Sequence, residues 1–226
     1  MPSNRALIIG ASRGLGLGLA QAYLTRGWDV TATIRGTART PLHDLKDKLR
    51  IESVDINHHD QVLALRERLA RDHFDLLFVN AGISNGPGET IGEVSTDSFT
   101  QVMITNALSP MRVIEEFGAL VPTTGSIAVM SSGLGSVADN EAGGWEVYRA
   151  SKAALNTLMR SYAARHKGDT RSLFLIAPGW VRTDMGGPNA GLDVETSISG
   201  VVSTIANHSS KPGLHYLNYQ GKTVRW

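Results

Sequence analysis

Residues 6–16 read Ala-Leu-Ile-Ile-Gly-Ala-Ser-Arg-Gly-Leu-Gly. The apolar run 6–9 predicts a buried strand, and apolar positions recur at helical spacing from Leu15 to Tyr23. A tight turn between them needs a residue without a Cβ, and close approach of the main chain to a pyrophosphate needs another. Free N–H groups and the positive dipole end at a helix start attract such an anion. We therefore predict a dinucleotide-binding turn; a glycine-rich turn without ligand is the alternative, because the chain has 24 glycines.

Apolar runs and helical patterns alternate along the rest of the chain. Further strands are predicted at 30–34, 51–56, 76–79, 126–130, 173–176 and 214–218, and helices at 97–118, 147–166 and 195–208, with Asp97 as the cap of the first of these. Such alternation implies right-handed βαβ crossovers. We predict an α/β protein with a single-domain Rossmann fold: a doubly wound, mainly parallel seven-stranded sheet with helices on both faces.

Three loops rich in glycine and polar residues follow the fourth, fifth and sixth predicted strands, at 83–96, 133–146 and 183–193. Ligands of such sheets bind at the carboxyl ends of the strands. We expect the loops to gather at that edge, in one domain over 1–226 with a cofactor half at about 1–110 and a catalytic and substrate-loop half at about 111–226.

Composition limits the classes of function. Lys plus Arg is 22 and Asp plus Glu is 21, so the net charge of +1 gives no electrostatic case for nucleic acid or an anionic membrane as a partner. The absence of cysteine excludes disulfides and thiolate chemistry. The histidines show no metal spacing, so we expect no metal site, and the lack of a membrane-length apolar run favours a cytoplasmic protein.

Five polar motifs stand at or near predicted strand ends and helices. They are Asn80-Ala81-Gly82, Asn106, Ser131-Ser132, the pair Tyr148 and Lys152, and the run Pro178-Gly179-Trp180-Val181-Arg182-Thr183. Tyr148 and Lys152 lie one helical turn apart and can face the same cleft. A tyrosine pKa of about 10 is too high for proton transfer near neutrality, and we expect the lysine cation to lower it. Donors placed in this way can stabilise negative charge that develops on an oxygen during a reaction.

Together, the ordered motifs and the spacing Gly-x-x-x-Gly-x-Gly resemble the short-chain dehydrogenase/reductase family over residues 5–184. Ile9 and Val79 depart from the usual threonine and asparagine. The resemblance implies that Tyr148 transfers a proton, that Lys152 also holds the nicotinamide ribose, and that Ser132 binds the substrate oxygen. It also implies that Asn106 orders a water leading to Lys152. Ser136 is an alternative to Ser132, because Ser132 stands farther from Tyr148 than is usual.

The cofactor implied is NADP(H). The position where NAD-preferring relatives carry an acid is Ile34, and Arg35 and Arg13 can pair with the extra phosphate. Thr37 and Arg39 are further candidates for contact with this phosphate. The predicted cofactor contacts are Gly10, Ser12, Arg13, Gly14, Leu15, Gly16, Arg35, Asp55, Ile56, Asn80, Ala81, Gly82, Tyr148, Lys152, Pro178, Gly179, Val181 and Thr183.

The function implied is hydride transfer between nicotinamide and a small carbonyl or alcohol substrate, as in a carbonyl reductase, with Asn140, Glu141 and Trp145 as candidate substrate contacts. The alternative is an NADP-binding regulatory or signalling protein, because the chain resembles the small C-factor and sniffer-like branch, including residues 221–226. The family's usual pairing implies a homodimer or homotetramer through helices 97–118 and 147–166. The small residues that would permit close packing are Ala150, Ser151, Ala153 and Ala154.

Overall fold

The computed structural model describes residues 3–86 and 88–226, so Met1, Pro2 and the Pro87 position of the loop predicted at 83–96 lie outside the described residues. Its strands are β1 (Arg5–Ile9), β2 (Asp29–Ile34), β3 (Arg50–Ser53), β4 (Leu76–Val79), β5 (Ser126–Met130), β6 (Ser172–Ala177) and β7 (Gly213–Asn218). They form one sheet in the order β3-β2-β1-β4-β5-β6-β7, and every neighbouring pair is parallel. The predicted Rossmann architecture is confirmed.

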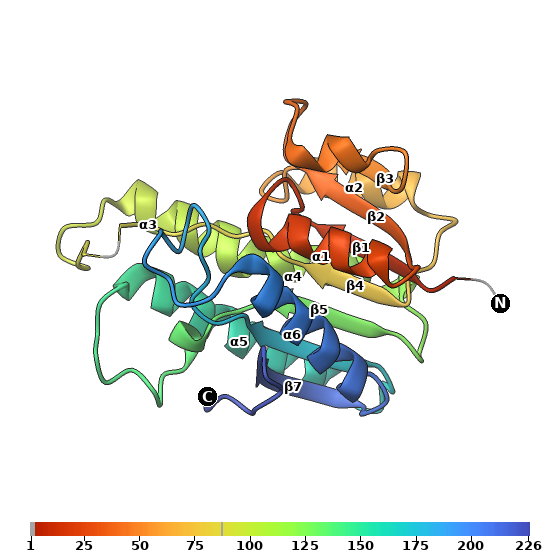
Figure 1. Cartoon of the computed structure of the whole chain (residues 1–226). Coiled ribbons are helices and arrows are strands. Elements are labelled where there is room, and N and C mark those ends of the chain that lie inside the picture. The colour runs from red at the N-terminus through yellow and green to blue at the C-terminus, as the bar shows by residue number, and fades with distance from the viewer. Residues whose placement is uncertain (1–2, 87) are drawn as a thin grey trace.

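Helices cover both faces of this sheet (Figure 1). They are α1 (Gly14–Thr25), α2 (His59–Arg68), α3 (Thr96–Met103), α4 (Ser109–Phe117), α5 (Glu146–Arg165) and α6 (Val194–His208). Leu7 and Ile9 pack in the core with α2, α4 and α5, whereas Ala6 and Ile8 pack with α1 and α6. Successive strand residues face opposite sides, so burial of both sides requires the continuous apolar runs seen in the sequence. No helix of the described residues has the length and apolarity needed to cross a membrane.

The helix predicted at 97–118 is not continuous. A π-helical turn, η2 (Ile104–Leu108), separates α3 from α4, and the N–H of Ser109 donates to the carbonyl of Ile104. Pro110 has no N–H to donate to the carbonyl of Asn106, which accounts for the irregular ladder at this point. The predicted cap was also wrong: Ser95, not Asp97, accepts a hydrogen bond from the N–H of Ser98 at 3.1 Å.

Short 3-10 turns add detail that periodicity did not predict: η1 (Pro41–Leu45), η3 (Gly118–Leu120) and η4 (Gly133–Gly135), the last inside the loop expected at 133–146. The third strand is shorter than predicted and ends at Ser53.

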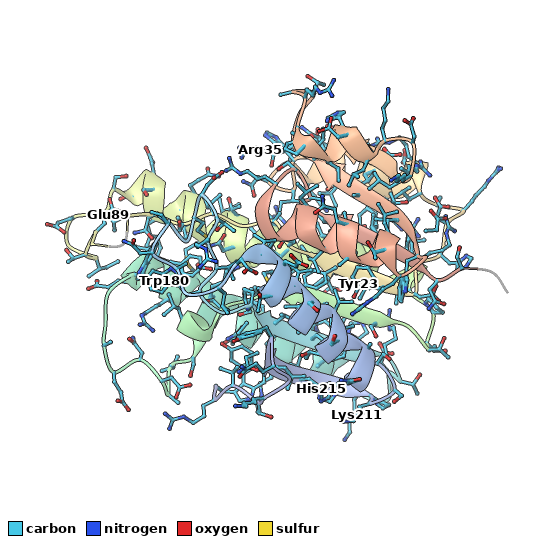
Figure 2. All side chains as sticks on the ribbon, viewed as in Figure 1. Tyr23, Arg35, Glu89, Trp180, Lys211 and His215 are labelled. Atoms are coloured by element: carbon cyan, nitrogen blue, oxygen red, sulfur yellow. The ribbon has the colours of Figure 1, made fainter. Side chains whose placement is uncertain are left out.

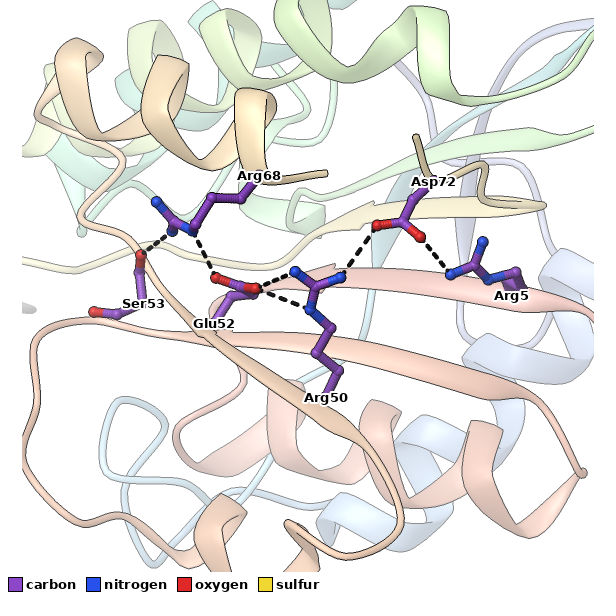
Figure 3. Close-up of polar contacts among 6 residues, drawn as sticks. All are labelled: Arg5, Arg50, Glu52, Ser53, Arg68 and Asp72. Atoms are coloured by element: carbon purple, nitrogen blue, oxygen red, sulfur yellow. Dashed lines mark hydrogen bonds and ion pairs between the residues drawn. The ribbon is translucent and has the colours of Figure 1, made fainter. Parts of the chain in front are cut away.

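Charged side chains connect this edge strand to α2 and β1 (Figure 3). Glu52 accepts from both Arg50 and Arg68, and Asp72 accepts from Arg50 and Arg5. Glu52 is only 12% exposed, so water screens this network less than it screens isolated surface pairs.

The three loops lie together at the carboxyl ends of the strands, as predicted (Figure 1). Glu146, at the start of α5, accepts from the N–H of Ile91 at 2.8 Å, which links the loop after β4 to the end of the loop after β5. Arg13 pairs with Asp184 at 3.1 Å, which links the glycine turn to the loop after β6. The sheet order reverses at β1, between β2 and β4, so the turn at 10–16 lies at the topological switch point where such folds bind ligands.

Candidate active site

The turn after β1 depends on glycine at three positions for different reasons. Gly10 and Gly14 have φ of +88° and +54°, a region that side chains disfavour. A Cβ on Gly16 would stand 2.0 Å from the carbonyl oxygen of Gly10, so only glycine lets α1 start this close to the turn. Asn80, at the end of β4, donates to the same carbonyl at 2.7 Å. The glycine turn and the Asn80-Ala81-Gly82 motif therefore form one structural unit.

The start of α1 is suited to an anion. Within the described residues, no side chain caps this helix and its first turn carries no acid, so its free N–H groups have no competing partner there. The predicted contacts Ser12 and Leu15 are half-buried, and Arg13 is exposed.

Asn106 lies buried in the π-helical turn. Its side chain exchanges two hydrogen bonds with the main chain of Ile83, both at 2.8 Å, and donates to the Ser151 hydroxyl at 3.0 Å. A Cβ on Gly82 would lie 3.3 Å from its Oδ1 and 3.5 Å from the Lys152 Nζ, so the motif after β4 meets both residues. Asn106 thus ties that loop to α5.

Ser132 follows β5 and is the N-cap of η4. Its Oγ accepts from the N–H of Leu134 at 3.1 Å, which leaves its own hydrogen available for donation. It also lies close enough to influence the pKa of Tyr148. The alternative, Ser136, is buried and accepts from the N–H of Asp139 at 3.1 Å. Ser132 therefore lies beside Tyr148, whereas the hydroxyl of Ser136 is engaged with the main chain of Asp139.

Tyr148 and Lys152 face the same side of α5, with the Nζ 5.7 Å from the centre of the tyrosine ring. Burial raises the pKa of Tyr148 to about 12, although the nearby Ser132 hydroxyl acts in the opposite direction. Burial lowers the pKa of Lys152 to about 8, and its ammonium donates to the carbonyl of Met130 at 2.9 Å. Burial therefore outweighs the lowering of the tyrosine pKa that was expected from Lys152, because loss of hydration disfavours the charged form of both groups.

The remaining predicted cofactor residues lie around the same edge. Arg35 follows β2 on the surface (Figure 2). Asp55 is half-buried and accepts from the N–H of Asn57 at 3.0 Å, and Ile56 is buried. Thr183 accepts from the N–H of Gly186 at 3.1 Å, and its Cγ2 would lie 3.5 Å from a Cβ on Gly14.

The Pro178–Thr183 run therefore reaches the glycine turn. Pro178 and Val181 are buried, whereas Gly179 is exposed with φ of +85°. Among the described residues, no group of three or more histidines and carboxylates could hold a metal ion.

Two further residues contact this group. Trp145 has φ of +53°, and it is the one non-glycine residue of the described chain with positive φ. Its ring centre lies 6.0 Å from that of Tyr148, edge to face, so this candidate substrate contact lies beside the proposed proton donor. Tyr216, in β7, donates to the carbonyl of Ser132. Its place in an ordinary strand offered no sequence signal.

The other candidate substrate contacts, Asn140 and Glu141, are exposed. Asn140 lines a pocket with Ser136, Arg149 and Ala153.

Similarity to known proteins extends over most of the chain. Residues 4–191 match the family described as short chain dehydrogenase. A structure described as a short-chain dehydrogenase/reductase from Burkholderia multivorans with bound NADP is 55% identical, covers 100% of both chains and has a TM-score of 0.97. A carbonyl reductase from Pseudomonas aeruginosa PAO1 in complex with NADP is 36% identical over 100% of both chains, with a TM-score of 0.92.

Among curated proteins, the C-signal of Myxococcus xanthus is 36% identical over 154 residues, which are 67% of this chain and 92% of that protein. This similarity agrees with the C-factor-like branch. The family match spans most of the chain and includes the glycine turn, Ser132, Tyr148 and Lys152. The chain therefore belongs to the short chain dehydrogenase family.

Proposed function

We propose that this protein is an NADP(H)-dependent carbonyl reductase that transfers hydride between nicotinamide and a carbonyl or alcohol substrate. The observation that carries the proposal is the meeting of Ser132, Tyr148 and Lys152 at the carboxyl edge of the sheet. A hydroxyl donor, a phenol and an ammonium in one place suit a reaction that develops negative charge on an oxygen.

The cradle fits a dinucleotide phosphate. The uncapped N–H groups of α1 provide donors, and Gly10 and Gly14, both at positive φ, place no side chain at these two positions of the turn. Arg35 and Arg13 supply positive charge, and Ile34 places no carboxylate where one would repel the second phosphate of NADP. Bound NADP in two of the relatives supports the same cofactor.

Because its pKa is raised to about 12, Tyr148 keeps its phenolic proton at neutral pH, and in carbonyl reduction it can supply the proton that the developing alkoxide needs. When bound, the reduced nicotinamide supplies hydride to the carbonyl carbon. Tyr148 donates its proton to the substrate oxygen, and the Ser132 hydroxyl donates a hydrogen bond to that oxygen. The Lys152 ammonium, held by the carbonyl of Met130, adds positive charge beside the phenol.

A panel of aldehydes and ketones, assayed with NADPH and with NADH, tests the proposal. We expect turnover, with a preference for NADPH in kcat/KM of about tenfold or more. Equal efficiency with the two cofactors would overturn the assignment of NADP(H), and the absence of turnover of any carbonyl would overturn the assignment of the activity.

A regulatory or signalling role remains the second candidate, supported by the similarity to C-signal. Mere cofactor binding would require neither Tyr148 nor the Ser132 hydroxyl. Tight NADPH binding without turnover in the carbonyl panel would favour this role.

We also propose a homodimer or homotetramer of cytoplasmic location that pairs through α4 and α5. The exposed Ala150 suits such packing, and Ala153 and Ala154 are half-buried. Ser151 does not suit it, because it is buried, accepts from Asn106 and donates to the carbonyl of Tyr148. Ser151 was therefore wrongly included among the interface residues. Sedimentation of the purified protein tests the assembly.

A further inference from the structure

The turn that carries Ser132 is held by a residue far along the chain. Tyr216 lies in β7, two strands away from β5, and its hydroxyl donates to the main-chain carbonyl of Ser132, 84 positions earlier. Its side chain is almost fully buried, at 2% exposure. The hydrogen bond from this buried hydroxyl holds the Ser132 peptide group in place. If it broke, the hydroxyl and the carbonyl would both be buried without a hydrogen-bond partner, which costs free energy.

Residues near Trp226 hold the following part of the same loop. The N–H of Ala138 donates to the carbonyl of Trp226 at 3.0 Å, and Arg225 forms an ion pair with Asp139. These contacts join the segment after β7 to the loop that follows Ser132.

The segment itself is anchored on Tyr216. The N–H of Val224 donates to the Tyr216 carbonyl at 2.9 Å, and the Trp226 ring lies 5.4 Å from the Tyr216 ring. The guanidinium of Arg160, from α5, lies 4.5 Å from the centre of the Trp226 ring. The loop is thus attached to β7 through Tyr216 and to the segment after β7 through Arg225 and Trp226. Trp226 also connects it to Arg160 of α5.

The inner side of the turn is attached to α5 by Asn156. Ser131 donates to its Oδ1 at 2.7 Å, and its Nδ2 donates to the carbonyl of Gly135 at 3.2 Å. A Cβ on Gly135 would lie 2.9 Å from that Nδ2, so the turn packs directly on the helix that bears Tyr148 and Lys152. Displacement of the part of the turn that Tyr216 holds would therefore move Ser132 relative to Tyr148.

We propose that Tyr216, Arg225 and Trp226 form a clamp that positions Ser132 for catalysis, and that Tyr216 is a positioning residue acting through the Ser132 main chain. The inference rests on the proposed function, because Ser132 must contact the substrate oxygen for its position to matter. Donors to a developing oxyanion act only at hydrogen-bond distance, and small misplacements lower the rate strongly.

Tyr216→Phe removes the hydroxyl and keeps the ring against Trp226. We expect kcat to fall about tenfold, with KM for NADPH unchanged, because the glycine turn makes none of these contacts. Tyr162→Phe is the matched control: Tyr162 is equally buried, at 2% exposure, and lies beside Arg171 rather than Ser132. We expect Tyr162→Phe to keep the wild-type kcat, even if its melting temperature falls by as much as that of Tyr216→Phe. Equal kcat in Tyr216→Phe and wild type would overturn the proposal.

A double-mutant cycle tests whether Tyr216 acts through Ser132. In a Ser132→Ala background, Tyr216→Phe should change the residual kcat by less than about twofold, because the group that it positions is gone. A fall as large as that in the wild-type background would show an independent effect and overturn the positioning role.

Hydrogen exchange separates failure of the clamp from failure of the proposed function. In Tyr216→Phe and in Trp226→Ala, the amides of residues 134–138 should exchange faster than in wild type, while amides of α1 keep their rates. This readout needs no turnover, so it tests the clamp even if the carbonyl panel fails. Unchanged exchange at 134–138 would overturn the clamp.

Discussion

The glycine turn after β1 and the serine turn after β5 lie at the same edge of the sheet, and they are held by different means. Around the first, the absence of side chains permits close contact, as between Gly16 and the carbonyl of Gly10. Around the second, side chains from β7 and α5 hold the main chain, as Tyr216 and Asn156 do. The cofactor side therefore depends on the absence of side chains at glycine positions of the turn. The catalytic side depends on side chains that come from distant parts of the chain.

This difference has a consequence for substitutions. A change in the serine turn or at Tyr148 should reduce catalysis and leave cofactor binding intact. A change in the glycine turn should affect both folding and cofactor binding. Each experiment below tests that separation.

The largest effect is expected from Tyr148→Phe. Loss of the proton donor should lower kcat for carbonyl reduction by about a thousandfold, within the range known for general acids. NADPH binding, measured by fluorescence titration, should stay within about twofold of wild type, because the phosphate cradle is untouched. Near-normal turnover in this variant would contradict the mechanism.

Gly16→Ala should be the most damaging change on the cofactor side. Its Cβ would lie 2.0 Å from the carbonyl of Gly10 and 2.9 Å from the Cα of Ala11, and main-chain atoms cannot yield cheaply. We expect a loss of about 3 kcal/mol in the free energy of unfolding, by denaturant titration, and weak NADPH binding. Gly92→Ala is the control, since its Cβ would meet nothing nearer than 4.0 Å. Similar stability of the two variants would refute the steric argument.

The pH dependence of reduction should reflect Lys152. Burial lowers its pKa to about 8, so its positive charge is present below that pH and is lost as the pH rises through it. Tyr148, with a pKa of about 12, keeps its proton throughout this range. The kcat/KM for reduction should therefore be level from pH 6 to 7 and fall above about pH 8, approaching tenfold per pH unit. A profile that is flat to pH 10 would exclude this role for the lysine charge.

The smallest effect is expected at the exposed end of the cofactor side. Arg35→Ala should lower the preference for NADPH over NADH about fivefold, because an exposed charge contributes modestly to binding. Arg26→Ala, an exposed arginine at the end of α1, should leave the preference unchanged. If both variants lose the preference equally, general positive charge rather than Arg35 selects the cofactor.

Much of this molecule could be predicted from its residues and their spacing. The sheet, the helices on both faces and the gathering of the three loops followed from alternating apolar runs. The four catalytic candidates were named from the order of motifs that resembles the short-chain dehydrogenase/reductase family, and their roles stay predictions. The prediction failed where contacts between distant segments decide the outcome. Neither the π-helical turn around Asn106, nor the inward-facing Ser151, nor the raised pKa of Tyr148 follows from residue spacing.

The sequence alone was sufficient for the glycine turn, because steric exclusion of a Cβ and the period of a helix act over a few residues. Ser132 shows the opposite case. Its motif was readable, but the choice between Ser132 and Ser136 as the neighbour of Tyr148 needed the folded chain. So did the link to Tyr216, because that hydrogen bond spans 84 positions and forms only when β6 pairs with both β5 and β7. Burial, which determines both pKa shifts, is likewise a property of the packed protein.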